Sequence, residues 1–137
     1  MSLKELMWTR HRNPWSGWTR VLVGFAMGHA LWLHDWIYLA ITIVAVITNP
    51  FWFPAPKRED AWMTRAVDGE RLWLGQADWL DKGVFFGPSA VMSLVLIWAL
   101  YHQDPIWSAL AGATVVIHKF LFLFFCVRFV ANVNRLN

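Results

Sequence analysis

The residues of this chain that could do chemistry are a few polar and ionisable side chains placed inside long apolar stretches. Such a group needs a partner or a water-filled cavity when apolar surroundings enclose it. His118 and Lys119 lie in the apolar stretch after Asp104, and Asn49 ends an earlier stretch that follows Asp35. In helices that rise about 1.5 Å per residue, Asn49 and His118 would be level, since each follows its aspartate by 14 residues. We therefore expect Asn49, His118 and Lys119 to share one polar intramembrane site.

Two roles are open for Lys119. Its long side chain could extend to the nearer membrane surface, as lysines close to helix ends do. It could instead bind an anion or a lipid headgroup at that surface. The sequence alone is compatible with both roles of Lys119.

His29 is another histidine within an apolar stretch and joins the candidate intramembrane polar residues. We expect it to make an interhelical hydrogen bond beside Gly24 and Gly28, whose spacing of four allows close helix packing. Paired histidines also serve as axial ligands of haem in membrane proteins. The rings of His29 and His118 would differ in depth by about 12 Å, however, whereas two ligands of one iron must be level. This offset argues against haem.

The expected turns hold a further group of candidate ligands, namely His34, Asp35, His102 and Asp104. Imidazole and carboxylate groups suit Zn²⁺ or Cu²⁺ if the turns bring them together. The alternative is that they are ordinary turn residues, which cap helices and face water. Cys126 is the one cysteine, which excludes an intrachain disulfide and a cysteine-based metal site. No nucleophile elbow or phosphate loop is present, so no catalytic residue is predicted, and metal or haem stays open as a cofactor.

The composition points to a membrane. Of the 137 residues, 58% are hydrophobic and only 15% are charged, which leaves more apolar surface than a soluble fold of this size can bury. The 11 Trp and 10 Phe suit a bilayer, where Trp rings sit at the level of the headgroups. The formal charge of +3 is the balance of 12 Lys and Arg against 9 Asp and Glu. Eleven of the 12 basic residues lie outside the expected spans, beside apolar runs, and form no basic surface, so we expect no nucleic-acid partner.

Four membrane spans account for the apolar stretches and their charges. Two spans are clear, at 84–101 and 106–130. Residues 21–48 are apolar except at His34 and Asp35, and form either one long helix or two shorter ones that meet at this pair. Basic residues flank this region on both sides and prefer the cytoplasm, which requires an even number of crossings. One long helix would also hold Asp35 in hydrocarbon at a cost of about 3 kcal/mol. The expected fold is an all-α integral membrane four-helix bundle of two helical hairpins.

The two expected hairpin turns resemble each other. Residues 30–40 and 99–109 align at an offset of 69 with five identities, among them Asp35 with Asp104. An internal duplication would give both hairpins the same orientation, related by an axis along the membrane normal. Chance similarity is the alternative, because membrane spans use few residue types.

We predict a single transmembrane domain over residues 1–137, with both termini on the cytoplasmic side of the membrane. Its expected parts are a cytoplasmic interfacial segment at 1–20, a first hairpin at 21–53, a cytoplasmic amphipathic segment at 54–82 and a second hairpin at 83–133. Arg10, Arg12 and Arg20 are expected to attract anionic lipid headgroups at roughly 1 kcal/mol each. One or two amphipathic helices, broken near Asp68 and Gly69, are expected between the hairpins.

Three short runs give the chain a family resemblance. They are His11-Arg12-Asn13-Pro14-Trp15-Ser16-Gly17-Trp18-Thr19-Arg20, then Asn49-Pro50, then Ala61-Trp62-Met63-Thr64-Arg65. With these runs the chain resembles a family of small uncharacterised prokaryotic membrane proteins. The resemblance covers most of the chain and implies a location in a prokaryotic cytoplasmic (inner) membrane, and it implies no chemistry.

The leading functional interpretation is a non-enzymatic membrane protein, either an accessory or assembly subunit or a homo-oligomer. Four short helices enclose little volume for a substrate, which favours this class. One alternative is a small transporter or channel built by dimerised hairpins, with His118 and Lys119 along its path. The other is a membrane-embedded metalloenzyme that uses the histidines and aspartates of the turns. Membrane lipids and a larger complex or a second copy of the chain are the expected partners.

Overall fold

A computed structural model gives the chain an all-α fold. The structure describes residues 2–136, apart from the side chains of Asn134 and Leu136, so residues 1 and 137 of the predicted domain lie outside the described residues. In this part of the chain there are six α-helices and one short 3₁₀ helix. They are α1 (Leu3–His11), α2 (Pro14–Trp32), α3 (Trp36–Thr48), η1 (Asn49–Phe51), α4 (Trp62–Gln76), α5 (Trp79–Tyr101) and α6 (Pro105–Leu136).

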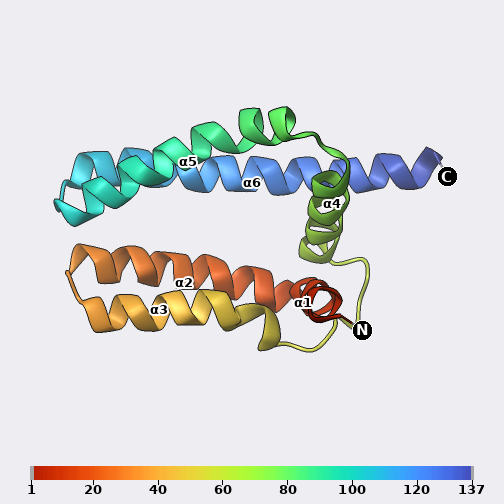
Figure 1. Cartoon of the computed structure of the whole chain (residues 1–137), viewed down its shortest axis with the longest axis horizontal. Coiled ribbons are helices and arrows are strands. Elements are labelled where there is room, and N and C mark those ends of the chain that lie inside the picture. The colour runs from red at the N-terminus through yellow and green to blue at the C-terminus, as the bar shows by residue number, and fades with distance from the viewer. Residues whose placement is uncertain (1, 137) are drawn as a thin grey trace.

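The helices form two hairpins joined by a crossing helix. Figure 1 shows α2 with α3 and α5 with α6 as two hairpins that lie side by side, with both turns at the same end of the molecule. At the other end α4 lies across the gap between the hairpins, and α1 lies beside the start of α2. Within residues 2–136, α5 and the part of α6 at Pro105–Val133 are long and apolar enough to cross a membrane. The apolar segment Trp36–Phe51 is shorter.

The turn at Asp35 is present, so residues 21–48 form two helices and not one. In both turns the last residue before the aspartate, His34 or Gln103, has a left-handed φ of 54°. The amide of the aspartate then donates to the carbonyl five residues earlier, at 3.0 Å for Asp35 and 2.9 Å for Asp104. This is a Schellman ending, which satisfies carbonyls that the finished helix leaves free.

Each aspartate also begins the next helix. Asp35 Oδ1 accepts from the amide of Tyr38 at 2.9 Å, and Asp104 Oδ1 accepts from the amides of Ile106 and Trp107 at 3.0 Å. These are N-cap hydrogen bonds, each worth about 1 kcal/mol. The predicted similarity of the two turns is therefore confirmed in their backbone geometry, while a duplication of the chain stays a prediction.

The two turns also bond to each other, reciprocally. His34 Nε2 donates to the carbonyl of Tyr101 at 2.7 Å, and Gln103 Nε2 donates to the carbonyl of Trp32 at 2.8 Å. At the offset of 69, His34 corresponds to Gln103 and Trp32 to Tyr101. The donor side chains therefore occupy equivalent positions in the two hairpins, and so do the acceptor carbonyls. This reciprocal pattern is typical of elements related by a twofold axis.

Helix α4 runs without a break through Asp68 and Gly69, so the predicted interruption there is wrong. The glycine has a packing role instead. A Cβ built at Gly69 would overlap the backbone carbonyl of Cys126, so only a residue without a side chain lets α4 lie this close to α6. Met63 and Ala66 of α4 are buried with Leu123 and Val127 of α6 along the same contact.

The second contact between α4 and the α5–α6 hairpin is aromatic. Trp73 is buried among the rings of Phe85, Phe86, Phe122 and Phe125, with centroid distances of 5.5 to 6.2 Å. All four pairs meet edge to face or tilted, which are arrangements that aromatic rings prefer over a face-to-face stack. Large apolar rings therefore hold the end of α4 that lies nearest to α5.

The close approach at Gly69 predicts a strong effect of a single methyl group. Gly69→Ala should lower the free energy of unfolding by about 3 kcal/mol or more, because a helix backbone cannot move aside as a flexible side chain can. Gly75→Ala is the matched control on the same helix, since a Cβ there meets no atom within 4 Å of it. It should be neutral or stabilise by up to about 1 kcal/mol. Thermal unfolding midpoints of the purified variants test this, and equal midpoints would contradict it.

Candidate functional site

The three runs of the family resemblance meet at one place, which we call the junction. It comprises residues 10–20, 49–54 and 61–70, at the end of the molecule away from the turns. The local sequence explains how residues 14–20 come to be helical. Asn13 Oδ1 accepts from the amide of Trp15 at 3.0 Å and caps α2, while Pro14 occupies the first helical position. Helix α2 therefore begins before the predicted start of the first hairpin at residue 21.

A buried hydrogen-bond network joins the start of α2 to the end of α3. Asn49 is fully buried, and its Oδ1 accepts from Ser16 Oγ at 2.8 Å. Its Nδ2 donates to Thr19 Oγ1 at 2.8 Å, and Thr19 donates in turn to the carbonyl of Trp15 at 2.7 Å. A buried amide without partners costs about 1 to 3 kcal/mol, so these bonds set how the two helices meet.

Arg12 holds α1 to α4. Its guanidinium forms ion pairs with Asp68, at a shortest distance of 2.5 Å, and with Glu59. Hydrogen bonding to Asp68 raises the pKa of Arg12 above its usual value, so the side chain stays charged. Thr64 Oγ1 donates to the backbone carbonyl of Arg12 at 2.9 Å and strengthens the same contact. The short peptide link between α1 and α2 is thereby fixed against α4.

Two further bonds close the loop after α3. Asn13 Nδ2 donates to the carbonyl of Pro54 at 3.0 Å, and Arg10 Nη1 donates to the carbonyl of Phe51 at 3.2 Å. Three prolines lie between residues 50 and 56 and prevent the helix from continuing, so backbone carbonyls here need other donors. Side chains of the first run supply them.

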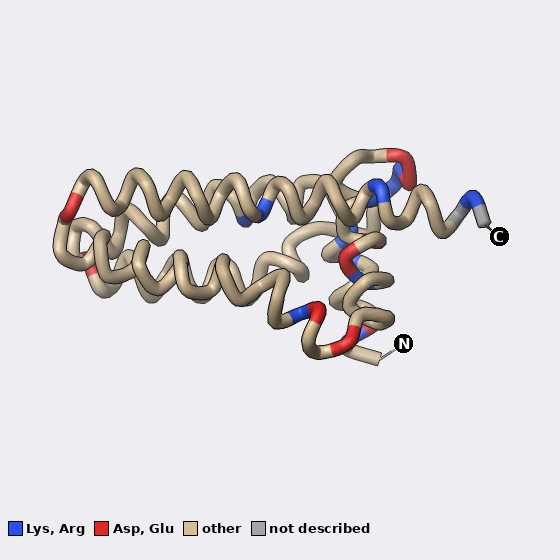
Figure 2. Tube along the Cα trace, turned by 90° about the horizontal axis from the view of Figure 1, so that it is seen from above, with Lys and Arg blue, Asp and Glu red and all other residues tan. Residues whose placement is uncertain are grey.

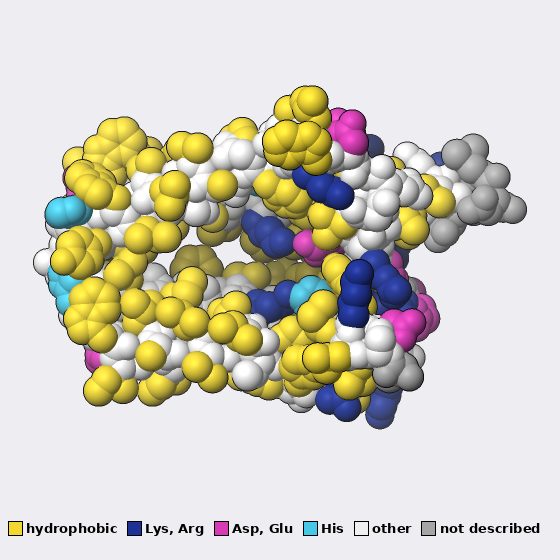
Figure 3. Space-filling view, in the orientation of Figure 1, with side chains coloured by type: hydrophobic (Ala, Val, Ile, Leu, Met, Phe, Trp, Pro, Cys, Tyr) yellow, Lys and Arg dark blue, Asp and Glu magenta, His cyan; other side chains and the backbone are white. Residues whose placement is uncertain are grey.

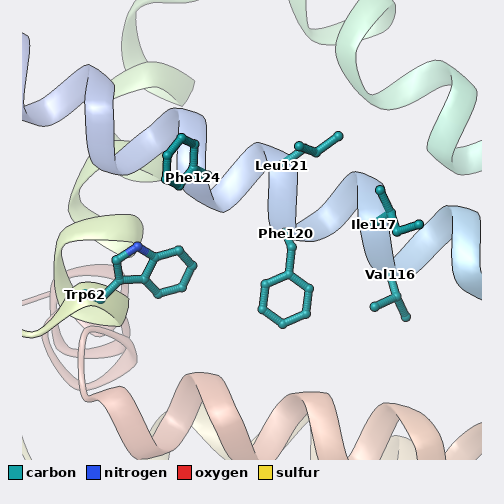
Figure 4. A pocket seen from close by; sticks show the side chains of 6 residues that line it. All are labelled: Trp62, Val116, Ile117, Phe120, Leu121 and Phe124. Carbon is teal, nitrogen blue, oxygen red and sulfur yellow. The ribbon is translucent and has the colours of Figure 1, made fainter.

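Aromatic side chains line the space between α2 and α6 at the junction. The ring of Trp18 lies 6.5 Å from Trp62 and 6.2 Å from Phe120. Beside them is an apolar groove of about 380 Å³, and Figure 4 shows Phe120 pointing from α6 toward α2 with Trp62 at one end. The groove is lined by Trp62, Val116, Ile117, Phe120, Leu121 and Phe124.

Four ionisable side chains come together next to this space, and we call them the charge cluster: His11, Arg20, Glu70 and Lys119. Figure 3 shows basic, acidic and histidine side chains gathered in the hollow between the hairpins, next to α4. Arg20 Nη1 lies 2.9 Å from His11 Nε2, and Lys119 Nζ lies 3.9 Å from Glu70 Oε1. Burial, together with the charges of Arg20 and Lys119, lowers the pKa of His11 to about 4, so its ring is neutral at pH 7.

The structure distributes the predicted intramembrane residues over different surroundings. Asn49 bonds to Ser16 and Thr19, and Lys119 lies beside Glu70. The ring of His118 packs 5.8 Å from Phe85, within the second hairpin, and its buried Nε2 has no hydrogen-bond partner among the described residues. Among the described residues, no hydrogen bond, ion pair or ring contact joins any two of these three, so the shared pocket stays a prediction.

His29 lies on the exposed surface of α2, and its ring is 6.1 Å from that of Tyr38 in the same hairpin. The contact joins two helices, and since no hydrogen bond of the His29 ring is found among the described residues, the expected interhelical hydrogen bond stays a prediction. Of the three arginines predicted to meet lipid headgroups, Arg10 and Arg12 have the internal partners described above, and Arg20 belongs to the charge cluster.

The turn residues proposed as metal ligands have other contacts. His34 bonds to the second hairpin, His102 stacks against Trp98 at 4.9 Å, and Asp35 and Asp104 cap helices. Among the residues that the structure describes, no group of three or more His, Cys, Asp or Glu side chains is placed to hold a metal ion.

Neither His11 nor Glu70 was predicted from the sequence to belong to a site. In the first hairpin, the start of the helix could have been predicted, because Asn13 followed by Pro14 is typical of a helix start. A helix from Pro14 places Ser16, Thr19 and Arg20 on one face, at the spacing of three and four residues. No comparable signal connects Glu70 to Lys119, which are 49 residues apart and meet only because α4 crosses α6.

Comparison with known proteins identifies a family and no function. Residues 1–81 match a protein family described as a family of unknown function, DUF6653. The match includes the junction, His11, Arg20 and Glu70, whereas Lys119 lies after it. The resemblance to an uncharacterised family is thus confirmed. Comparison with curated proteins and with solved structures gives no match.

The buried network around Asn49 predicts coupled effects of two substitutions. Asn49→Ala should lower the free energy of unfolding by about 2 to 3 kcal/mol, because it leaves the buried hydroxyl of Ser16 without an acceptor. Adding Ser16→Ala removes that hydroxyl, so the double variant should lose less than the sum of the two single losses. Asn132→Ala, on the exposed surface of α6, is the control and should change stability by less than about 0.5 kcal/mol. Denaturant or thermal unfolding is measured for the unaltered chain, Asn49→Ala, Ser16→Ala, the double variant and the control, and strictly additive losses would disprove the coupling.

Proposed function

We propose that this chain, which belongs to the DUF6653 family of unknown function, is a four-span integral protein of a prokaryotic cytoplasmic membrane. We further propose that it acts there as a non-enzymatic scaffold, as a subunit of a larger particle. The observation that carries the proposal is the position of both hairpin turns at one end and of the charged junction at the other.

The helix lengths support four crossings. Helix α2 has 19 residues and would be roughly 28 Å long, and Trp36–Phe51 would be roughly 24 Å long, against a hydrocarbon core of about 30 Å. The exposed side chains of α3 are apolar along one face, at Ile37, Ile41, Val44 and Ile47. Such a face suits lipid or another transmembrane helix.

The distribution of charge supports the orientation. No Lys or Arg occurs between Arg20 and Lys57 or between Lys82 and Lys119, so the turn end has none. Figure 2 shows acidic residues at the turns and mixed charges at the junction end. Because cytoplasmic segments are rich in Lys and Arg, the junction and both termini are proposed to lie in the cytoplasm.

The contacts at the junction support a structural role. Arg12, Asn13, Ser16, Asn49 and Thr64 use their polar atoms for bonds within the chain, where they position helices. Catalytic groups instead need polar atoms that remain free to contact a substrate. The large apolar exterior is the surface through which a scaffold of this kind would meet its partners.

Labelling of single cysteines tests the four crossings. In a Cys126→Ala background, Leu33→Cys and His102→Cys should both react with a membrane-impermeant maleimide added to intact cells, or spheroplasts where an outer membrane is present. Lys57→Cys should react only after the membrane is permeabilised. All three positions are exposed in the fold, so access depends on the side of the membrane. Opposite behaviour of the two turn positions would refute the four-span arrangement.

The mass of the native particle tests the scaffold role. After gentle solubilisation, light scattering with the detergent contribution subtracted should give a protein mass well above the 15.9 kDa of one chain. Either several copies of this chain or a stoichiometric second protein meets the expectation. A stable particle of a single chain would reject the scaffold role and leave the membrane topology unaffected.

A further inference from the structure

The charge cluster contains more positive than negative charge. Arg20 donates from Nε to the carbonyl of Ser16 at 3.1 Å and contacts the neutral ring of His11, and neither partner carries a charge. Among the described residues, no carboxylate forms an ion pair with Arg20. Glu70 is the one carboxylate of the cluster, and it lies at 3.9 Å from Lys119, the outer limit for an ion pair. Since partly buried charges are costly without partners, an anion would stabilise this arrangement.

His11 positions the guanidinium of Arg20. A guanidinium can only donate, so His11 Nε2 must accept from Arg20, and the proton of the neutral ring is then on Nδ1. This Nδ1 is buried and points away from Arg20, so His11 orients the guanidinium while the remaining N–H groups of Arg20 stay available to a ligand. A phosphate group offers several acceptor oxygens and forms strong, charge-assisted bonds with arginine and lysine.

The cluster lies at a depth where a lipid headgroup could reach it. Arg20 is fifteen residues before Asp35, and Lys119 is fifteen residues after Asp104, so both lie roughly 22 Å from the turns. Across a hydrocarbon core of about 30 Å, this depth falls in the half nearer the junction. The side chain of Lys119 is 54% exposed, which leaves it open to a ligand from outside the chain.

An apolar surface for an acyl chain lies directly beside the cluster. Phe120 follows Lys119 in α6 and lines the groove of about 380 Å³, and Trp18, two residues before Arg20, contacts the ring of Phe120. Cations next to an open apolar groove match the two parts of an anionic lipid. A free phosphate ion would use only the cations.

We propose that Arg20, held in place by His11, and Lys119 bind the phosphate of an anionic membrane lipid whose acyl chain lies in the groove formed by Trp62 and α6. Glu70 holds Lys119 toward the hollow and keeps the empty site from carrying two unbalanced cations. The inference rests on the proposed membrane location and adds a ligand class to it.

The test uses the full chain in a mild detergent and measures lipid binding by native mass spectrometry. Dioctanoyl phosphatidylglycerol is the anionic probe, and dioctanoyl phosphatidylcholine, which has the same phosphate and no net charge, is the comparison. Arg20→Gln with Lys119→Gln should weaken binding of phosphatidylglycerol at least tenfold and leave phosphatidylcholine unchanged. Lys57→Gln with Arg65→Gln removes the same charge from exposed positions outside the cluster and should bind like the unaltered chain.

Three results would overturn the proposal. The first is an equal loss in the control pair, which would show a general effect of net charge. The second is equal binding of the two lipids by the unaltered chain. The third is displacement of phosphatidylglycerol by inorganic phosphate at comparable concentration, which would make the cluster a site for free anions.

A folding control keeps the test decisive. If Arg20→Gln with Lys119→Gln fails to fold, Lys119→Gln alone replaces it, because this side chain is exposed, and it should weaken binding at least threefold. Unchanged binding by this variant would also reject the site. Because lipid binding is measured on the purified chain, its failure leaves the labelling result for the turns intact, and the reverse is also true.

Discussion

Three consecutive residues at the middle of α4 hold the two hairpins together. Asp68 pairs with Arg12 beside the first hairpin, Gly69 lies against the backbone of Cys126 in the second, and Glu70 faces Lys119. These three contacts, two ion pairs and one close approach of helix backbones, all lie within one turn of α4. Because the glycine lacks a side chain, α4 comes near enough to α6 for Glu70 to lie beside Lys119. The hollow and the charge cluster depend on this crossing.

The two hairpins are in contact at both ends of the molecule and lie apart between these ends. At one end the turns exchange two hydrogen bonds, from His34 and Gln103 to backbone carbonyls, and at the other end α4 lies across the gap. Between these ends the space is lined by apolar side chains of α6 and by Trp18. A rigid frame closed at both ends can keep a groove open, whereas two hairpins packed along their full length would fill it.

Polar contacts rather than apolar burial specify the arrangement at the junction. In the proposed lipid environment, apolar side chains gain little by leaving lipid for protein, so helix association depends on close packing and on hydrogen bonds. Asn49 contributes both close packing and hydrogen bonds, because it is fully buried and its side chain bonds to Ser16 and Thr19. The same reasoning explains why so many polar residues of a short run, from Arg10 to Arg20, have internal partners.

The sequence by itself determined the helical class, the two turns at Asp35 and Asp104 and their similarity, because apolar periodicity, helix caps and charge placement are local properties. The two-hairpin membrane bundle inferred from them remains a proposal. Only the tertiary structure decided what the polar residues contact. Asn49 matched His118 in depth, yet its bonds go to α2, because depth along a helix says nothing about the direction of a side chain around it. The glycine at position 69 was read as a break, although it permits contact with a segment 57 residues later. Such long-range contacts leave no pattern in one sequence.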